Sequence, residues 1–233
     1  MKQQNLMINE IPAVLWGSTS SRVFVAVHGD KSNKSDEAVV IFAEEAAKKG
    51  YQTLSFDLPE HGERQGKPDR CGFERCVEDL KAVMAYARKN FESVGVFGCS
   101  LGAYFCMLAY PRERIRQSLF LSPVVDMMGL IRGIMTGFGI SEEQLAQAGM
   151  IETPVKTLYW EDYCYAKERV LAWDKPTALL CGEKDVVCDL ETVTQFAKQS
   201  NADITVMAAG EHYFHTAEQL DFYRKWLERT IEN

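Results

Sequence analysis

The chain has 233 residues, of which 46% are hydrophobic and 25% are charged, values typical of an ordinary soluble globular protein. Its formal net charge is −7 and no basic run occurs, so neither nucleic acid nor an anionic membrane surface is expected as a partner. No stretch approaches the ~18 apolar residues of a membrane span. The N-terminal residues also lack the apolar run of a signal peptide.

Seven cysteines are scattered along the chain, and none forms a Cys-x-x-Cys pair. This spacing argues against a zinc site, and the odd number fits reduced thiols in a cytoplasmic protein. We therefore predict no metal, no cofactor and a cytoplasmic location. The sequence leaves the oligomeric state open.

Strands and helices are predicted to alternate along the chain. Apolar runs rich in β-branched residues indicate buried strands, and apolar residues at helical spacing indicate helices packed on the sheet. In chain order the predicted elements are an antiparallel edge strand at 11–17, a strand at 22–27, a helix at 35–49, a strand at 51–56, helix 73–90, strand 93–98, helix 101–109, strands 117–121 and 177–181, helix 190–199, strand 204–207 and helix 217–230. This order favours a mostly parallel sheet with helices on both faces, built as one domain over residues 1–233.

One segment, residues 123–175, breaks the alternation. It shows no strand pattern and is rich in methionine, tyrosine and tryptophan. We interpret it as a helical cap insertion that lies over one end of the sheet. The alternative is that its helices pack as ordinary core helices.

The sequence Gly98-Cys99-Ser100-Leu101-Gly102 has the pattern of a nucleophile elbow. It follows a buried strand and opens a helix, which is the context that a strained strand-to-helix turn requires. The turn should project the Ser100 hydroxyl outward, and the Leu101 N–H at the helix start is suited to hold an oxyanion. We expect the Cys99 side chain to point into the sheet as a small buried group.

The chain resembles the α/β-hydrolases over almost its whole length. The resemblance is carried by four blocks in the family's order: His28-Gly29 after an early strand, the segment from Asp57 to Gly62, the Ser100 elbow, and the late segments around Asp185 and His212. It is similar above all to cap-bearing esterases related to bacterial feruloyl and cinnamoyl esterases, with dienelactone-hydrolase-like and prolyl-oligopeptidase-like members also similar.

The resemblance implies a Ser–His–Asp triad. The family's chain order, serine then acid then histidine, assigns the base to His212, with His215 as the neighbouring alternative. The family's Gly-x-x-Asp pattern assigns the acid to Asp185, with Asp126 as the alternative from the preceding strand. The expected catalytic residues are thus Ser100, Asp185 and His212.

The resemblance also assigns the second oxyanion N–H to Asp30, whose side chain is unusual at this place. A carboxylate so near an oxyanion is unfavourable unless it points outward or contacts Lys31 or Lys34. Glu60 likewise replaces a glycine that is common in the family's Asp-x-Pro-Gly-His-Gly block, and His61 is interpreted as a structural turn residue.

Together these observations predict a serine hydrolase that cleaves a carboxylic ester of a small or medium, apolar or aromatic acyl group through an acyl-enzyme. A thioesterase or a small-peptide hydrolase is the alternative reaction. A ligand-binding protein of the same fold without turnover is the alternative from another class. The expected partner is a small-molecule ester.

Overall fold

The computed structural model describes residues 1–233 and is built on an eight-stranded sheet in the order β1-β2-β4-β3-β5-β6-β9-β10. The strands are β1 (Gln3–Ile8), β2 (Ile11–Trp16), β3 (Arg22–Val27), β4 (Gln52–Phe56), β5 (Ser93–Cys99), β6 (Ser118–Leu121), β9 (Thr177–Gly182) and β10 (Asp203–Met207). From β4 to β10 all neighbours pair in parallel, whereas β1 and β2 are antiparallel. The mostly parallel sheet predicted from the sequence is confirmed.

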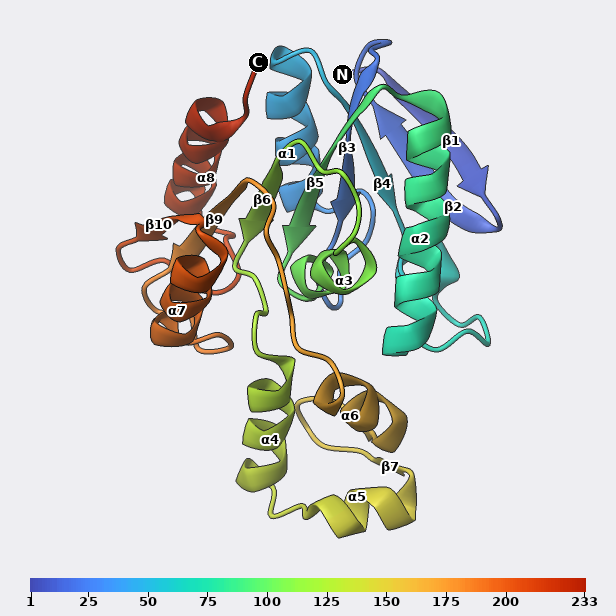
Figure 1. Ribbon diagram of the computed structural model, residues 1–233, viewed down its shortest axis with the longest axis vertical. Helices are drawn as coiled ribbons and strands as arrows, with labels where there is room; N and C mark the ends of the chain where they lie inside the picture. Colours follow the sequence, from blue (N-terminus) through green and yellow to red (C-terminus); the bar gives the residue numbers. More distant parts are fainter.

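Helices cover both faces of this sheet (Figure 1). They are α1 (Glu37–Lys48), α2 (Phe73–Asn90), α3 (Leu101–Ala109), α7 (Leu190–Ser200) and α8 (Ala217–Thr230), with a short 3-10 turn η1 (Gly62–Arg64). The apolar side chains of α1 and α8 form one core cluster with the sheet, and those of α2, α3 and α7 belong to the larger cluster on the opposite face. The apolar stripes seen in the sequence therefore face the sheet, and the predicted helices are confirmed.

The predicted position of the edge strand is wrong. Strand β2 is antiparallel as expected, but it lies second in the sheet, and the edge is β1. A two-residue hairpin at Asn9 and Glu10 joins them, and both residues have positive φ angles (45° and 68°). Positive φ at both positions gives a turn whose twist matches that of the flanking strands.

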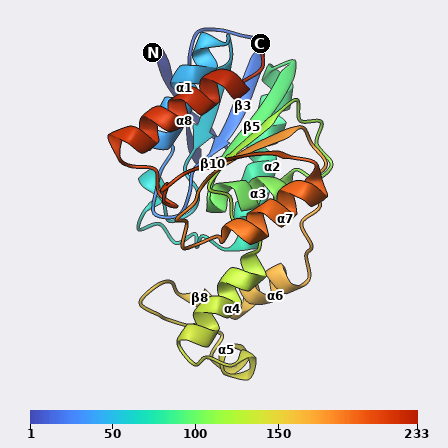
Figure 2. The same cartoon turned by 90° about the vertical axis from the view of Figure 1, so that its left-hand side faces the viewer.

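Residues 123–175, called the insertion below, lie beyond the carboxyl ends of the parallel strands and far from both chain termini (Figures 1 and 2). The insertion contains α4 (Met127–Gly137), α5 (Glu142–Ala148) and α6 (Trp160–Lys167). It also contains a small antiparallel pair, β7 (Met150–Ile151) with β8 (Leu158–Tyr159), so the expectation of no strand there is wrong. Its buried side chains, such as Leu145 and Trp173, continue the larger core cluster.

Candidate active site

Ser100 is the single residue between β5 and α3, and its backbone is strained (φ 50°, ψ −115°). Two close approaches explain the glycines beside it. A Cβ added to Gly98 would lie 2.6 Å from the Ala103 Cα, and one added to Gly102 would lie 2.3 Å from the Val27 carbonyl oxygen. Only glycine fits at either place, so the strand and the helix can meet at this sharp turn and expose the serine hydroxyl.

A chain of two hydrogen bonds joins Ser100 to a histidine and an aspartate. The Ser100 Oγ lies 2.8 Å from the His212 Nε2, and the His212 Nδ1 lies 2.7 Å from the Asp185 Oδ2. The other carboxylate oxygen of Asp185 accepts the N–H groups of Val187 and Cys188 at 2.8 and 3.0 Å. Both Asp185 oxygens are therefore occupied, which fixes the carboxylate and, through it, the imidazole ring.

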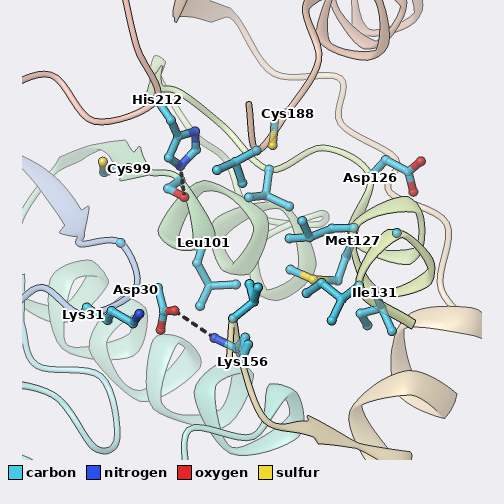
Figure 3. Close-up of a pocket in the computed structure, with 18 of the residues that line it drawn as sticks. Asp30, Lys31, Cys99, Leu101, Asp126, Met127, Ile131, Lys156, Cys188 and His212 are labelled. Carbon is cyan, nitrogen blue, oxygen red and sulfur yellow. Dashed lines mark hydrogen bonds and ion pairs between the residues drawn. The ribbon is translucent and has the colours of Figure 1, made fainter. Parts of the chain in front are cut away.

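The two residues considered as alternatives lie outside this chain. Asp126 caps the N-terminus of α4, where its side chain accepts the Gly129 N–H at 2.8 Å, and Figure 3 shows it directed away from His212. The His215 ring lies 2.7 Å from the carbonyl oxygen of Tyr213, and about half of its side chain is exposed. The structure thus brings together Ser100 and the preferred acid and histidine.

Two backbone N–H groups lie free beside Ser100. The close packing of α3 on the end of β3 places the turn after β3 against the elbow, and a Cβ on Gly29 would lie 3.4 Å from the Ser100 Cβ. The next N–H along that turn belongs to Asp30, and the first N–H of α3 belongs to Leu101. Neither group donates a hydrogen bond within the chain. Free N–H groups at a helix start and a neighbouring turn can bind a negatively charged oxygen.

The Asp30 carboxylate points to the insertion. Its Oδ2 accepts a hydrogen bond from the Lys156 ammonium at 3.0 Å (Figure 3). Its Oδ1 lies 3.5 Å from the His61 Nε2. The hydrogen bond with His61 and the charge of Lys156 hold the pKa of Asp30 well below its usual range. The ion-pair partner of Asp30 is thus Lys156 rather than Lys31 or Lys34. Lys34 instead forms a buried ion pair with Asp57. No sequence pattern singles out Lys156, which lies 126 residues away along the chain.

The turn after β4 is stabilised by Glu60 and His61. Glu60 has a left-handed backbone (φ 62°), and its side chain accepts the Cys71 N–H at 2.7 Å. This hydrogen bond offsets part of the strain that a glycine would avoid. His61 is buried, with its Nδ1 2.7 Å from the Pro59 carbonyl oxygen and its Nε2 3.1 Å from the Lys31 backbone nitrogen.

A cavity of about 1070 Å³ lies between the elbow and the insertion. Ser100 and His212 both line it. Figure 3 shows His212 on one wall and the α4 residues Met127 and Ile131 on the opposite wall. The apolar residues that α4 contributes are Met127, Leu130, Ile131 and Ile134, and Gly133 and Gly137 also face the space. The sequence predicted an apolar insertion without indicating which of its residues line the cavity, because that depends on how the helices fold back.

Cys99, next to Ser100 in the chain, is the other nucleophilic side chain at the elbow. Cys99 is only partly buried and borders the cavity, so the expectation of a buried side chain is wrong. Burial still raises the pKa of its thiol to about 12, which disfavours the reactive thiolate. No three His, Cys, Asp or Glu side chains are grouped so that they could hold a metal ion. None of the helices combines the length and the apolar character needed to cross a membrane.

Comparison with known proteins gives structural likenesses alone. No family model matches the sequence, and a comparison with curated proteins found no match. Est1E from Butyrivibrio proteoclasticus, in a structure with ferulic acid bound, is 20% identical with a TM-score of 0.81, and the match covers 97% of this chain and 96% of that one. Alpha/beta hydrolase domain-containing protein 10 from mouse is 15% identical with a TM-score of 0.75 and 98% of both chains covered.

The Pyrococcus furiosus esterase Pf2001 is 19% identical with a TM-score of 0.68, and the match covers 98% of this chain and 87% of that one. These matches span nearly the whole chain, so the likeness includes the insertion as well as the sheet. Together with the strand order and the elbow, they identify the chain as a protein with the α/β-hydrolase fold.

Proposed function

We propose that this protein is a serine hydrolase that cleaves carboxylic esters of small or medium, apolar or aromatic acyl groups through an acyl-enzyme. The observation that carries the proposal is the hydrogen-bonded chain from Ser100 through His212 to Asp185, which opens into an apolar cavity. A serine hydroxyl becomes a useful nucleophile when a base lies within hydrogen-bond distance and a third group orients that base.

In the first half of the reaction, Ser100 Oγ attacks the ester carbonyl carbon while its proton passes to His212 Nε2 at 2.8 Å. Asp185 accepts the hydrogen bond from Nδ1, which keeps the Nε2 lone pair directed at the serine and stabilises the imidazolium that forms. His212 then gives the proton to the departing alkoxide, and the acyl group remains on Ser100.

The N–H groups of Leu101 and Asp30 bind the oxyanion of the tetrahedral intermediate. They are suited to this because they lie beside Ser100 and have no other partner in the chain. The Asp30 carboxylate opposes negative charge nearby, but Lys156 and His61 contact it and draw it outward. This pairing makes an acidic residue compatible with the position.

In the second half, water takes the place of the alcohol. His212 removes a proton from the water, which attacks the acyl carbon. The same two N–H groups hold the second oxyanion, and the proton returns to Ser100 Oγ as the acid leaves. Apart from the ester and water, both halves of the reaction use only groups of this chain.

The cavity supports an apolar or aromatic acyl group. Its volume of about 1070 Å³ lies just above the usual range of about 300–1,000 Å³ for small-molecule sites. The wall facing Ser100 consists of Met127, Ile131 and their neighbours. The bound ferulic acid of Est1E, which shares this fold, favours an aromatic acid as well. The seven free cysteines fit a cytoplasmic setting for this activity.

Hydrolysis of a matched substrate panel tests the proposal. The panel contains two acyl groups, acetyl and hydroxycinnamoyl. Each acyl group is offered as a 4-nitrophenyl ester, an alkyl ester, a thioester and an amide. We expect ester hydrolysis by the wild-type protein and a loss of several orders of magnitude in Ser100→Ala. If thioesters or amides were hydrolysed faster than esters, the protein would be a thioesterase or an amide hydrolase instead of an esterase. Ester hydrolysis that persists in Ser100→Ala would remove Ser100 from the mechanism.

A further inference from the structure

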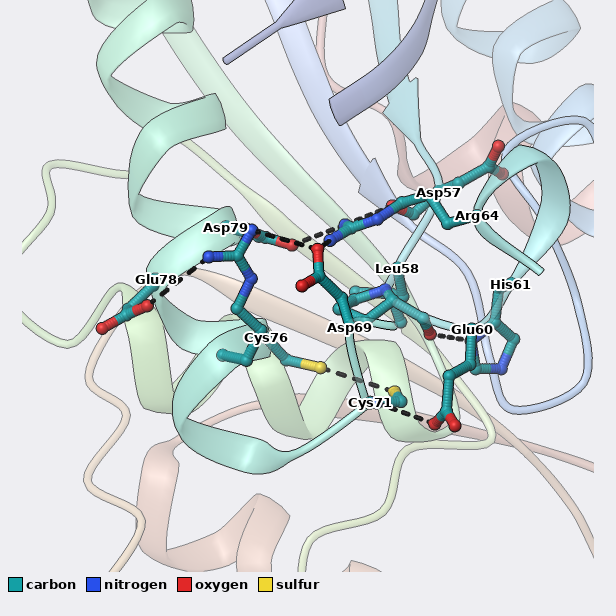
Figure 4. Close-up of polar contacts among 12 residues, drawn as sticks. Asp57, Leu58, Glu60, His61, Arg64, Asp69, Cys71, Cys76, Glu78 and Asp79 are labelled. Carbon is teal, nitrogen blue, oxygen red and sulfur yellow. Dashed lines mark hydrogen bonds and ion pairs between the residues drawn. The ribbon is translucent and has the colours of Figure 1, made fainter. Parts of the chain in front are cut away.

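Two cysteines face each other at the start of α2, outside the proposed active site. The sulfurs of Cys71 and Cys76 lie 3.4 Å apart (Figure 4). Helix α2 begins at Phe73 with Gly72 as its N-cap, so the two thiols stand at the positions before the cap and in the first turn that often pack together as an apolar pair. In this helix the pair consists of two oxidisable groups.

The two sulfurs differ in accessibility and in acidity. Cys76 is completely buried, whereas Cys71 is partly exposed. The Cys76 S–H and the neighbouring His61 ring lower the pKa of the Cys71 thiol to about 6, and burial raises the pKa of Cys76. The partly exposed Cys71 therefore carries the more acidic of the two thiols, and the thiolate is the form that reacts with oxidants.

The backbone around Cys71 is held on both sides. Its N–H donates to the Glu60 carboxylate at 2.7 Å, and the Phe73 N–H donates to Asp162 of α6 at 2.9 Å. Arg70 also binds Asp162, with Nη1 2.6 Å from a carboxylate oxygen. The two thiols are thus kept face to face by the segment that anchors α6 to the core.

We propose that Cys71 and Cys76 form a peroxide-responsive thiol pair, in which Cys71 reacts first and Cys76 closes an intramolecular disulfide. The Cys71 thiolate attacks one oxygen of hydrogen peroxide and breaks the O–O bond. The other oxygen leaves as hydroxide and becomes water with the proton that Cys71 had released. Cys76 then attacks the Cys71 sulfenic acid, the S–O bond breaks, and the hydroxyl leaves as water with the Cys76 proton.

Two thiols and one peroxide thus give one disulfide and two waters, with two electrons passing from sulfur to oxygen. Closing the bond requires the sulfurs to approach from 3.4 Å to about 2.0 Å. The site is separate from the proposed triad, so its chemistry does not depend on Ser100.

Peptide mapping after peroxide treatment tests the pair in the intact protein. Trypsin cleaves after Arg70, Arg75 and Lys81, so Cys71 and Cys76 fall on separate peptides that only a disulfide can join. We expect stoichiometric hydrogen peroxide, followed by alkylation and digestion without reductant, to give the linked peptides 71–75 and 76–81. The link should disappear with reductant and form equally in Ser100→Ala. Absence of the linked peptides while other cysteines oxidise would overturn the proposal.

Three variants test the order of the steps. In Cys76→Ser we expect a sulfenic acid at Cys71 that a cyclic 1,3-dione traps, and in Cys71→Ser we expect neither the adduct nor the link. Cys164→Ser is the matched control, because Cys164 is also partly exposed, and it should form the link as the wild type does. A trapped sulfenic acid at Cys76 in Cys71→Ser, or none at Cys71 in Cys76→Ser, would contradict the order of the steps.

Discussion

The two walls of the cavity are built by different kinds of contact. At the elbow, residues 98–102, backbone packs directly on backbone, and a Cβ on Gly102 would lie 2.3 Å from a carbonyl oxygen of β3. In the insertion, Gly133 and Gly137 of α4 face open space, with no atom within 4 Å of an added Cβ. The elbow therefore allows a single arrangement, whereas the insertion can change its side chains without disturbing the sheet.

The contact that joins the insertion to the elbow side of the cavity is also weaker than the contacts within the elbow. The Asp30–Lys156 pair is about two-fifths exposed on each side, and exposed pairs of this kind contribute between about 0 and 1 kcal/mol. The elbow is instead joined to its neighbours by parallel strand pairing on both sides of β5. We infer that the elbow sets the chemistry and that the insertion sets which acyl group fits.

After the loss of the nucleophile or the base, the largest expected effect is the loss of the acid. In Asp185→Asn, the amide donates to His212 Nδ1 and leaves the proton on Nε2, which then cannot accept the Ser100 proton. We expect kcat for a 4-nitrophenyl ester to fall by about 10⁴-fold. Asp126→Asn is the matched control, since asparagine also caps a helix, and its kcat should stay within a few-fold of the wild type. Equal losses in the two variants would contradict the assignment of the acid.

Two glycine-to-alanine changes should shift stability in opposite directions. Gly102 and Gly133 both lie inside helices, where alanine is favoured by about 1 kcal/mol. We expect Gly133→Ala to gain up to this amount. Gly102→Ala should lose about 3 kcal/mol because its methyl group collides with the β3 backbone. Urea unfolding measures both, and a Gly102→Ala protein as stable as the wild type would show that the elbow is not tightly packed.

Acid should destabilise the protein through His28, which lies just after β3. Burial lowers the pKa of His28 to about 4 from its ordinary 6.5. Between pH 6.5 and pH 4 the unfolded chain binds a proton at this histidine that the folded chain does not. The contribution of His28 to the free energy of unfolding is therefore fully present above pH 6.5 and is lost as the pH falls toward 4. The contribution is about 3 kcal/mol.

Unfolding free energies measured from pH 7 to pH 4 check this contribution. His28→Asn should show a shallower pH dependence than the wild type. His215→Gln should keep the full slope, because that ring is half exposed. If His28→Asn kept the full wild-type slope, another group would have to be responsible.

The smallest expected effect concerns substrate choice. Gly133→Leu places a side chain in open space at the cavity wall, so we expect kcat/KM for a hydroxycinnamoyl ester to fall about tenfold while the acetyl ester is unaffected. Thr136→Leu puts the same side chain on an exposed part of α4 that does not line the cavity, and it should change neither value. A uniform loss on both esters in Gly133→Leu would show that the elbow had been disturbed.

The parts of the fold with a strong apolar pattern could be predicted from the sequence. Strands β3 and β5 are buried on both faces, so their apolar runs are continuous and leave a clear signal. Strand β1 leaves almost none, because its residues Gln3–Ile8 are mostly exposed and pair through the backbone. The turn at Asn9 and Glu10 was the available signal, since asparagine tolerates positive φ.

The candidate site likewise contains residues that could be predicted from the sequence and contacts that could not. The residues brought together at Ser100 were predictable because local motifs and chain order carry them. The contacts of Asp30 with Lys156 and of Cys71 with Cys76 were not predicted. The first depends on how the insertion folds back over the sheet. The second depends on where α2 begins, because the helix start places Cys71 just before the N-cap Gly72 and Cys76 in the first turn.

Covalent labelling with a fluorophosphonate tests the central claim most directly. The reagent phosphonylates a serine that a neighbouring base activates, and fluoride leaves. We predict that intact-protein mass and peptide mapping will find one phosphonyl group per chain on Ser100, with no labelling in Ser100→Ala and strongly slowed labelling in His212→Gln. A folded wild-type protein that stays unlabelled, or that is labelled elsewhere, would contradict the account.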